Sequence, residues 1–220
     1  MSETKSLKDQ NAWLIRATMI GHAISFVWIA LEPTKLCGTG AVGVGSKLEA
    51  LAVPGSASLG LIVIASLLLL GFIPPTWRDR IIHLRWHHPL PGSRAFSKIG
   101  PETAHVDMQR LEEKHGPFPE DPAAQNQLFY RVYKPLRDDV GVCDSHRRYL
   151  AARDVGTITA LLMIPLPILA FLATGNFARS GVYGLLLVVT FLLCAVAAKN
   201  YSLRMVQHVL ALTGATVAAD

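Results

Sequence analysis

The chain has 220 residues, of which 51 % are hydrophobic and only 17 % are charged. This composition is too apolar for an ordinary soluble domain and is typical of a small membrane protein with several spans. The formal net charge is +5. The three cysteines, Cys37, Cys143 and Cys194, share no metal-ligand or redox spacing, and their expected positions in an outer loop, a cytoplasmic block and a span exclude a disulfide framework.

Four apolar runs, at residues 12–31, 59–73, 155–174 and 182–198, predict four transmembrane helices. Each run can cross a bilayer core of about 30 Å at a rise of about 1.5 Å per residue, the second and fourth with help from flanking residues. The sequence therefore predicts an all-α polytopic membrane protein with a helical cytoplasmic module. Its predicted regions are a two-span region at 1–74 with an outer loop at 32–58, the module at 75–154, and a second two-span region with a tail at 155–220.

The distribution of Lys and Arg predicts the orientation. Of the 21 basic residues, 18 lie in the N-terminal part, the 75–154 block and the C-terminal tail, against Lys35, Lys47 and Arg179 on the other side. By the positive-inside rule, both termini and the block are expected to be cytoplasmic. The block also carries eleven acidic residues, which indicates a mixed, solvated surface rather than a nucleic-acid-binding stripe.

Three polar residues share one face of the first predicted span. Thr18, His22 and Ser25 are separated by four and three residues, so a helix places them side by side. An ionisable group at this depth is expected to face protein or water rather than lipid. This face is therefore predicted to be either a helix contact or a pore lining.

The polar block begins with a segment, residues 76–88, that predicts a basic amphipathic helix at the inner membrane surface. Asp79, His83 and His87 recur every four residues, so a site with two histidines and one carboxylate can be drawn. The alternative is a face that is simply basic and polar. We favour that alternative and expect no bound metal.

Further along the block, the Pro and Gly content of residues 89–100 predicts a loop. Asp121 is a good N-cap and is followed by proline, which predicts a helix at residues 122–133. On that helix, Gln125 and Phe129 are expected to point into the core of the module.

The acidic pair at residues 138–139 predicts the start of a last cytoplasmic helix that continues into the third span. Pro165 and Pro167 predict a kink in the middle of that span, because each removes a backbone donor. Residues 175–181 predict a short outer turn between antiparallel spans. The tail at 200–212 is semi-apolar and predicts an interfacial or oligomer-contact helix.

Five basic residues are candidates for binding a phosphate or nucleotide, since each is a good donor to an anion. Two lie in the Gly/Pro loop and three on the helix that leads into the third span: Arg94, Lys98, Arg147, Arg148 and Arg153. The alternative is that the arginines contact lipid headgroups or pair with Asp144 and Asp154. A ligand bound there would act on the segment that joins the module to the kinked helix.

No nucleophile, phosphate-loop or metal motif is present in the sequence. A hydrolase built on scattered polar residues such as His105, Asp107, His115 and His146 is conceivable, because histidine is the usual general base near neutral pH. Histidines scattered over short helices are more often surface or core residues. We therefore expect no enzyme activity and no cofactor.

Three motifs in the block carry a resemblance: PGSRAF from Pro91, QNQLFY from Gln125 and RRYLAARD from Arg147. The stretch of about 70 residues around them resembles the soluble segment of a group of small bacterial multi-spanning proteins associated with phage-defence loci. The layout is similar to that of the four-helix membrane effectors that accompany nucleotidyltransferases. The resemblance implies an inner-membrane effector that permeabilises the membrane under control of a nucleotide or oligonucleotide, with a nucleotidyltransferase as possible partner. It assigns no role to any residue.

The predicted function is therefore a ligand-controlled channel or pore-forming effector. Because four short spans are too few for most transport pathways, a homo-oligomer, a tetramer around a shared axis, is expected. Two alternatives stay open: a non-catalytic membrane scaffold or sensor subunit, and a membrane-embedded hydrolase that would need His83, His87 or His105.

Overall fold

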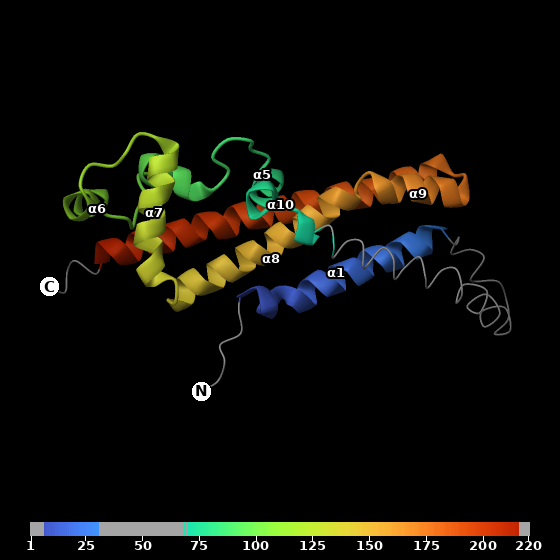
Figure 1. The fold of residues 1–220 in the computed structure, drawn as a ribbon, viewed down its shortest axis with the longest axis horizontal. Coiled ribbons are helices and arrows are strands. Elements are labelled where there is room, and N and C mark those ends of the chain that lie inside the picture. Colours follow the sequence, from blue (N-terminus) through green and yellow to red (C-terminus); the bar gives the residue numbers. More distant parts are fainter. Residues whose placement is uncertain (1–6, 31–67, 69, 216–220) are drawn as a thin grey trace, which may run out of the picture. The chain divides into compact units, whose positions relative to one another are not determined.

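The computed structural model describes residues 7–30, 68 and 70–215, and the described part is all-helical, without strands. Figure 1 shows the helices in chain order. They are α1 (Leu7–Ala30), α5 (Pro75–His83), η1 (Pro91–Arg94), η2 (Ala95–Ile99), α6 (Met108–His115), α7 (Pro122–Leu136), α8 (Val140–Leu162), α9 (Pro165–Thr174) and α10 (Phe177–Ala215). The all-α prediction is confirmed for these residues.

The chain divides into two compact units that interleave along the sequence. The first unit takes Met1–Pro74 and Asp154–Cys194, and the second takes Pro75–Arg153 and Ala195–Asp220. The sequence predicted three consecutive regions instead. The difference arises because the C-terminal part of α10 packs with the 75–153 block, so α8 and α10 each contribute to both units.

The core of the first unit joins α1, α8, α9 and α10. Its fully or almost fully buried members are Met19, Ile158, Leu162, Leu166, Ala170, Tyr183 and Leu187. His22 is buried against α8, with Nε2 3.1 Å from the hydroxyl oxygen of Thr159. Tyr183 of α10 donates its hydroxyl to the backbone oxygen of His22 at 3.2 Å. These contacts place hydrogen-bond partners beside His22 within the apolar core of this unit.

Among the described residues, α10 alone is long and apolar enough to span a membrane by itself. The pair formed by α8 and α9 meets the same criterion only if it is counted as one bent span. Much of the apolar surface of α10 is exposed within the chain, at Val182, Leu185, Leu186, Val189, Leu192, Leu193 and Val196. Contact of such an apolar surface with lipid is favourable, whereas its contact with water is unfavourable.

The predicted first span coincides with α1. By length and composition, the described part of α1 does not qualify as a membrane span by itself. The second predicted span and the outer loop at 32–58 lie mostly or wholly outside the described residues. Helical structure at the first, third and fourth predicted spans is therefore observed, and the number of spans stays a prediction.

The proline-rich part of the third predicted span is bent, as expected. The axes of α8 and α9 differ by 42° across a break at Met163 and Ile164. The connection from α9 to α10 is shorter than the predicted turn at 175–181, because it consists only of Gly175 and Asn176. Gly175 adopts a left-handed conformation, φ 63°, which ends α9 after Thr174.

The core of the second unit is built mainly from η2, α6, α7 and α10. It includes Ala95, Phe96, Ile99, Leu111, Leu128, Phe129, Val132, Val142, Val206, Val209 and Leu210. The helix predicted at residues 200–212 is observed, and its contact with a membrane interface or another copy stays a prediction. This segment continues α10 and buries Val206, Val209 and Leu210 within its own chain.

Carboxylates begin the helices of this unit as the sequence suggested. Asp121 accepts from the backbone N–H of Ala124 at 2.8 Å, at the start of α7. Asp139 accepts from Gly141 at 2.9 Å and from Val142 at 3.1 Å, at the start of α8. Each cap satisfies backbone donors that have no partner within the first turn of a helix.

The structure of two segments differs from the prediction. The helix expected at 76–88 ends at His83, because Leu84 takes a left-handed conformation with φ 51° and His88 precedes a proline. The loop expected at 89–100 is instead a 3₁₀ turn followed by a π-helical turn, η1 and η2. Burial of Ala95, Phe96 and Ile99 in the core outweighs the local preference for a loop.

Candidate functional site

A buried ion pair connects α5 to α8 in the second unit. The hydroxyl of Tyr149 donates to Asp79 Oδ1 at 2.7 Å, and Arg153 Nη1 donates to the same oxygen at 3.2 Å. The side chains of Arg153 and Asp79 are only 7 % and 9 % exposed. Burial and the Asp79 carboxylate raise the pKa of Tyr149, so its phenol stays protonated and donates.

His83 lies one turn after Asp79 on α5 and stacks on the ring of Tyr149, with ring centres 5.7 Å apart. Burial lowers the pKa of His83 to about 4, and the cations of Arg94, Arg85 and Arg153 add to this effect against the opposing charge of Asp79. His83 is therefore a neutral ring at neutral pH.

A pocket of about 300 Å³ opens beside His83, and we call it the basic pocket. Its polar lining residues are His83 from α5, Arg94 at the end of η1, Lys98 and Glu102 in and after η2, and Lys199 and Ser202 from α10. Lys98 lies 4.0 Å from Glu102, and both side chains are more than half exposed, so this pair is weak. The pocket thus presents three cations against one carboxylate.

Two buried nitrogen atoms in the wall of the basic pocket, His83 Nε2 and Arg94 Nε, have no hydrogen-bond partner among the described residues. Burial lowers the pKa of the Arg94 guanidinium, and the neighbouring Arg85 lowers it further. Both observations indicate positive charge and hydrogen-bonding capacity that this part of the chain does not itself satisfy. An anionic oxygen is the chemical group that would satisfy the donor at Arg94 Nε.

A second pocket, of about 230 Å³, lies nearby and shares Pro91 and Ser202 with the basic pocket. We call it the aromatic pocket, because Phe129, Tyr130, Tyr133 and Tyr149 line it together with Asp79, Asn126, His146 and Arg153. The hydroxyl of Tyr133 is 2.8 Å from His146 Nδ1. Burial lowers the pKa of His146, which is therefore a neutral partner in this contact at neutral pH.

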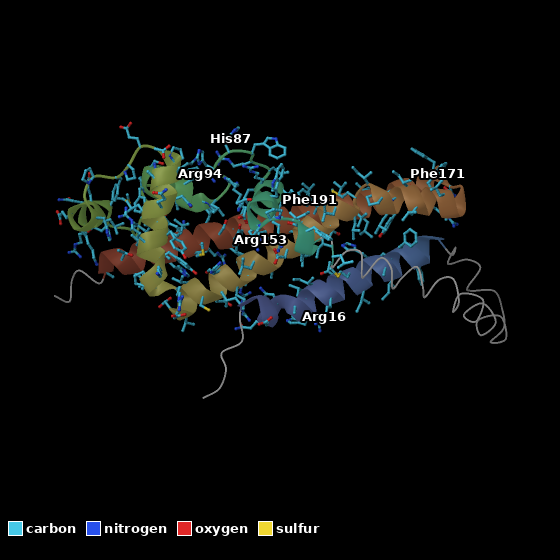
Figure 2. All side chains as sticks on the ribbon, viewed as in Figure 1. Arg16, His87, Arg94, Arg153, Phe171 and Phe191 are labelled. Atoms are coloured by element: carbon cyan, nitrogen blue, oxygen red, sulfur yellow. The ribbon has the colours of Figure 1, made fainter. Side chains whose placement is uncertain are left out.

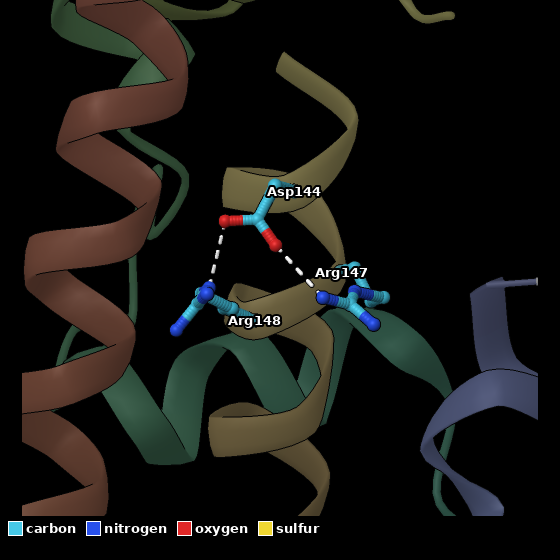
Figure 3. A network of polar contacts seen from close by, with 3 residues as sticks. All are labelled: Asp144, Arg147 and Arg148. Atoms are coloured by element: carbon cyan, nitrogen blue, oxygen red, sulfur yellow. Dashed lines mark hydrogen bonds and ion pairs between the residues drawn. The ribbon is translucent and has the colours of Figure 1, made fainter. Parts of the chain in front are cut away.

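Of the five predicted anion ligands, Arg94 and Lys98 both line the basic pocket. Arg153 of α8 lines the aromatic pocket instead, where it pairs with Asp79. Figure 2 shows Arg153 on α8 and Arg94 on η1. Arg147 and Arg148 belong to neither pocket lining. Figure 3 shows both turned towards Asp144, with Arg147 Nη2 2.8 Å from Oδ1 and Arg148 Nε 2.7 Å from Oδ2. For these two, the predicted alternative of pairing with a carboxylate of their own helix is the one observed.

The other candidates have local roles. Thr18 donates to the backbone oxygen of Leu14, and His22 makes the contacts with Thr159 and Tyr183, which are those of helix packing. Ser25 is half-buried on α1. His87 lies beyond the end of α5, so it does not continue a helical face with Asp79 and His83. No group of three His, Cys, Asp or Glu residues within the described ranges is arranged to hold a metal ion.

The residues proposed for a hydrolase also take separate positions. Asp107 caps α6 by accepting from Arg110 N at 3.1 Å, and His146 contacts Tyr133. His105 is exposed in the segment before α6, and His115 ends that helix.

His83, Lys199 and Ser202 also line the basic pocket, although the sequence did not predict them as anion ligands. Lys199 had a usable signal, since it is the first charged residue after the apolar run at 182–198. Because the helix continues through residue 199, the position of this charge just after the apolar segment is defined by the helix itself. No family model, no curated protein and no solved structure was found to match this chain.

Proposed function

We propose that this protein is a channel or pore-forming effector of the bacterial inner membrane, controlled by an anionic ligand of nucleotide type that binds the basic pocket. The observation that carries the proposal is the continuity of α10. One helix contains the exposed apolar stretch suited to a bilayer and, directly after it, Lys199 and Ser202 of the basic pocket.

The chemistry of the two pockets supports a phosphate-bearing ligand. Arg94, Lys98 and Lys199 supply charge for phosphate oxygens, and Arg94 Nε has no hydrogen-bond partner within the described part of the chain. The aromatic pocket offers ring faces on which a nucleobase can stack, and Asn126 offers an amide for its edge. A nucleotide or short oligonucleotide combines both groups.

Binding would be transmitted through α10. A ligand can shift a conformational equilibrium only if it contacts the two states differently, and the pocket spans segments from α5, η1, η2 and α10. Drawing Lys199 towards a bound phosphate would displace the helix that carries the apolar stretch. A conducting path then requires several copies, and a tetramer with cytoplasmic termini is the proposed assembly, with a nucleotidyltransferase as a candidate source of the ligand.

The test is ion flux through liposomes that contain the purified full chain, with and without cyclic and linear oligonucleotides. Ligand binding is measured separately by calorimetry in phospholipid-free detergent, which distinguishes a soluble anion from a lipid headgroup. We expect the variant Lys98→Gln/Lys199→Gln to weaken binding about tenfold or more and to lose the flux response, because two charge-assisted contacts are removed.

Lys134→Gln is the matched control, since Lys134 is exposed on α7 and lines neither pocket. It should bind ligand and conduct as the unchanged protein does. Binding without flux by an intact oligomer would reject the channel and favour a sensor or scaffold subunit. Neither binding nor flux with any oligonucleotide would reject the proposal as a whole.

A further inference from the structure

The turn after α5 holds two large apolar side chains in water-accessible positions. Leu84 is 69 % exposed and Trp86 is 65 % exposed. Both Leu84 and His88 have positive φ, 51° and 45°, a conformation that non-glycine residues adopt rarely. The turn folds Trp86 back onto α5, where its ring meets that of Trp77 edge to face with centres 5.5 Å apart. An unusual backbone thus presents apolar surface that the described part of the chain leaves uncovered.

Positive charge surrounds this pair. Arg80 Cζ lies 5.0 Å from the centre of the Trp77 ring. Arg78 and Arg85 belong to the same segment, residues 76–88. Its single acidic residue, Asp79, is buried in the ion pair with Arg153. The exposed part of the segment therefore carries no negative charge.

A groove of about 400 Å³ lies beside Trp86, and we call it the Trp86 groove. Arg80, His87 and His88 line one part, and Asn126 and Gln127 of α7 contribute side-chain amides. It shares no lining residue with the basic pocket. His87 lies on the exposed turn that leads from α5 to η1 (Figure 2).

We propose that the Trp86 groove binds the headgroup of an anionic phospholipid, with Arg80 at the phosphate and Trp77, Leu84 and Trp86 in the interfacial layer of the bilayer. Chain continuity supports a lipid as the occupant. Phe72, which is 80 % exposed, is the last helical residue of the described stretch 70–72 and lies three residues before α5 begins. Tryptophan beside arginine at the end of an apolar segment is the arrangement that membrane interfaces favour. The groove shares Leu90 and Asn126 with the aromatic pocket but no residue with the basic pocket, so the two proposals place their phosphates at separate sites.

Tryptophan quenching by brominated lipids tests the proposal. The chain has four tryptophans, so a Trp13→Phe/Trp28→Phe variant leaves Trp77 and Trp86 as reporters. The full chain is placed in phosphatidylcholine nanodiscs that contain a small fraction of either brominated phosphatidylglycerol or brominated phosphatidylcholine. We expect at least twofold stronger quenching by phosphatidylglycerol at equal mole fraction, because the groove would enrich the anionic lipid around the reporters.

Arg80→Gln should abolish this excess, and Lys134→Gln, an equal change of charge on α7, should retain it. Excess inorganic phosphate should leave it unchanged, since acyl chains anchor the lipid. Equal quenching by the two lipids, no quenching by either, an unchanged excess in Arg80→Gln, or displacement by inorganic phosphate would each overturn the proposal. If the reporter variant does not fold, the excess quenching of the unsubstituted chain is compared with that of Trp86→Phe, which should lose it.

Discussion

The carboxylate of Asp79 joins two segments that lie 70 residues apart in the sequence. It accepts from Tyr149 and Arg153, which stand one helical turn apart on α8. A buried ion pair need not stabilise a protein more than apolar residues of the same size would, because both charges lose their hydration. Removing only one partner is different, since the remaining charge is then buried without compensation.

We therefore predict that Asp79→Asn and Arg153→Met each lower the free energy of unfolding by about 3 kcal/mol. The double variant should lose less than the sum of the two single losses, because no uncompensated charge is left. Urea unfolding in detergent, followed by tryptophan fluorescence, measures all three. Strictly additive losses would show that the two side chains do not interact. Asp138→Asn, which alters a carboxylate that is 86 % exposed, should change stability by less than about 0.5 kcal/mol.

Spacing alone could not predict which arginine forms an ion pair with which carboxylate. Asp144 has Arg147 and Arg148 at three and four residues, so their local pairing was a foreseeable alternative. The partner of Arg153 comes from α5, and only the fold determines which distant helix lies beside α8. For the same reason Arg94 and Lys98 were predicted as anion ligands, while their companions Lys199 and His83 were not.

Helix α7 and the 3₁₀ turn η1 pack closely at Gly92. A Cβ atom at that position would lie 2.6 Å from Asn126 Oδ1 and 2.8 Å from Phe129 Cδ1. Glycine is thus required by the close approach of the two elements and not by its backbone conformation. This packing also forms one wall of the aromatic pocket.

Gly92→Ala should consequently lower the free energy of unfolding by about 1 to 3 kcal/mol, because the side chains of α7 must move to admit the methyl group. The midpoint of thermal unfolding in detergent is a sufficient measurement. Gly181→Ala is the comparison, since no atom of the described residues lies within 4 Å of a Cβ at that position in α10. A loss of equal size in both variants would mean that the contact at Gly92 is not the cause.

Helices with a strong start signal were predicted well from sequence. Asp121 with its following proline, and the acidic pair before α8, satisfy free N–H groups locally, so no distant contact is needed to define them. Residues 89–100 were wrongly predicted as a loop because their helical turns depend on burial of Ala95, Phe96 and Ile99. The end of α5 was missed because the left-handed conformation of Leu84 has no signature in its residue type.

Orientation in the membrane is a property of the entire chain. Under the proposed arrangement, the second unit faces the cytoplasm and the connection between α9 and α10 faces the opposite side. In a variant without the three native cysteines, Phe177→Cys should react with a membrane-impermeant maleimide in intact spheroplasts. Lys134→Cys should react only after permeabilisation, because the positive-inside rule retains the basic block within the cell. The reverse pattern of labelling would contradict the orientation.

The apolar runs and the polar block were recognisable because they are continuous in sequence, and composition suffices to identify them. The packing partner of residues 200–212 could not be recognised from sequence, since apolar positions at helical spacing look alike whether they face lipid, another copy or the chain's own core. Val206, Val209 and Leu210 meet the side chains of the central block. That contact exists only in three dimensions.

The split of the second unit between residues 75–153 and the end of α10 affects how the protein is made. Residues 75–153 are synthesised well before Val206, Val209 and Leu210. The core of the second unit is therefore incomplete while the rest of α8, α9 and most of α10 are synthesised. Its apolar surface stays exposed until that core is completed. A fragment of residues 75–153 expressed alone would keep an incomplete core with exposed apolar surface. Adding residues 195–215 to the same polypeptide would complete that core.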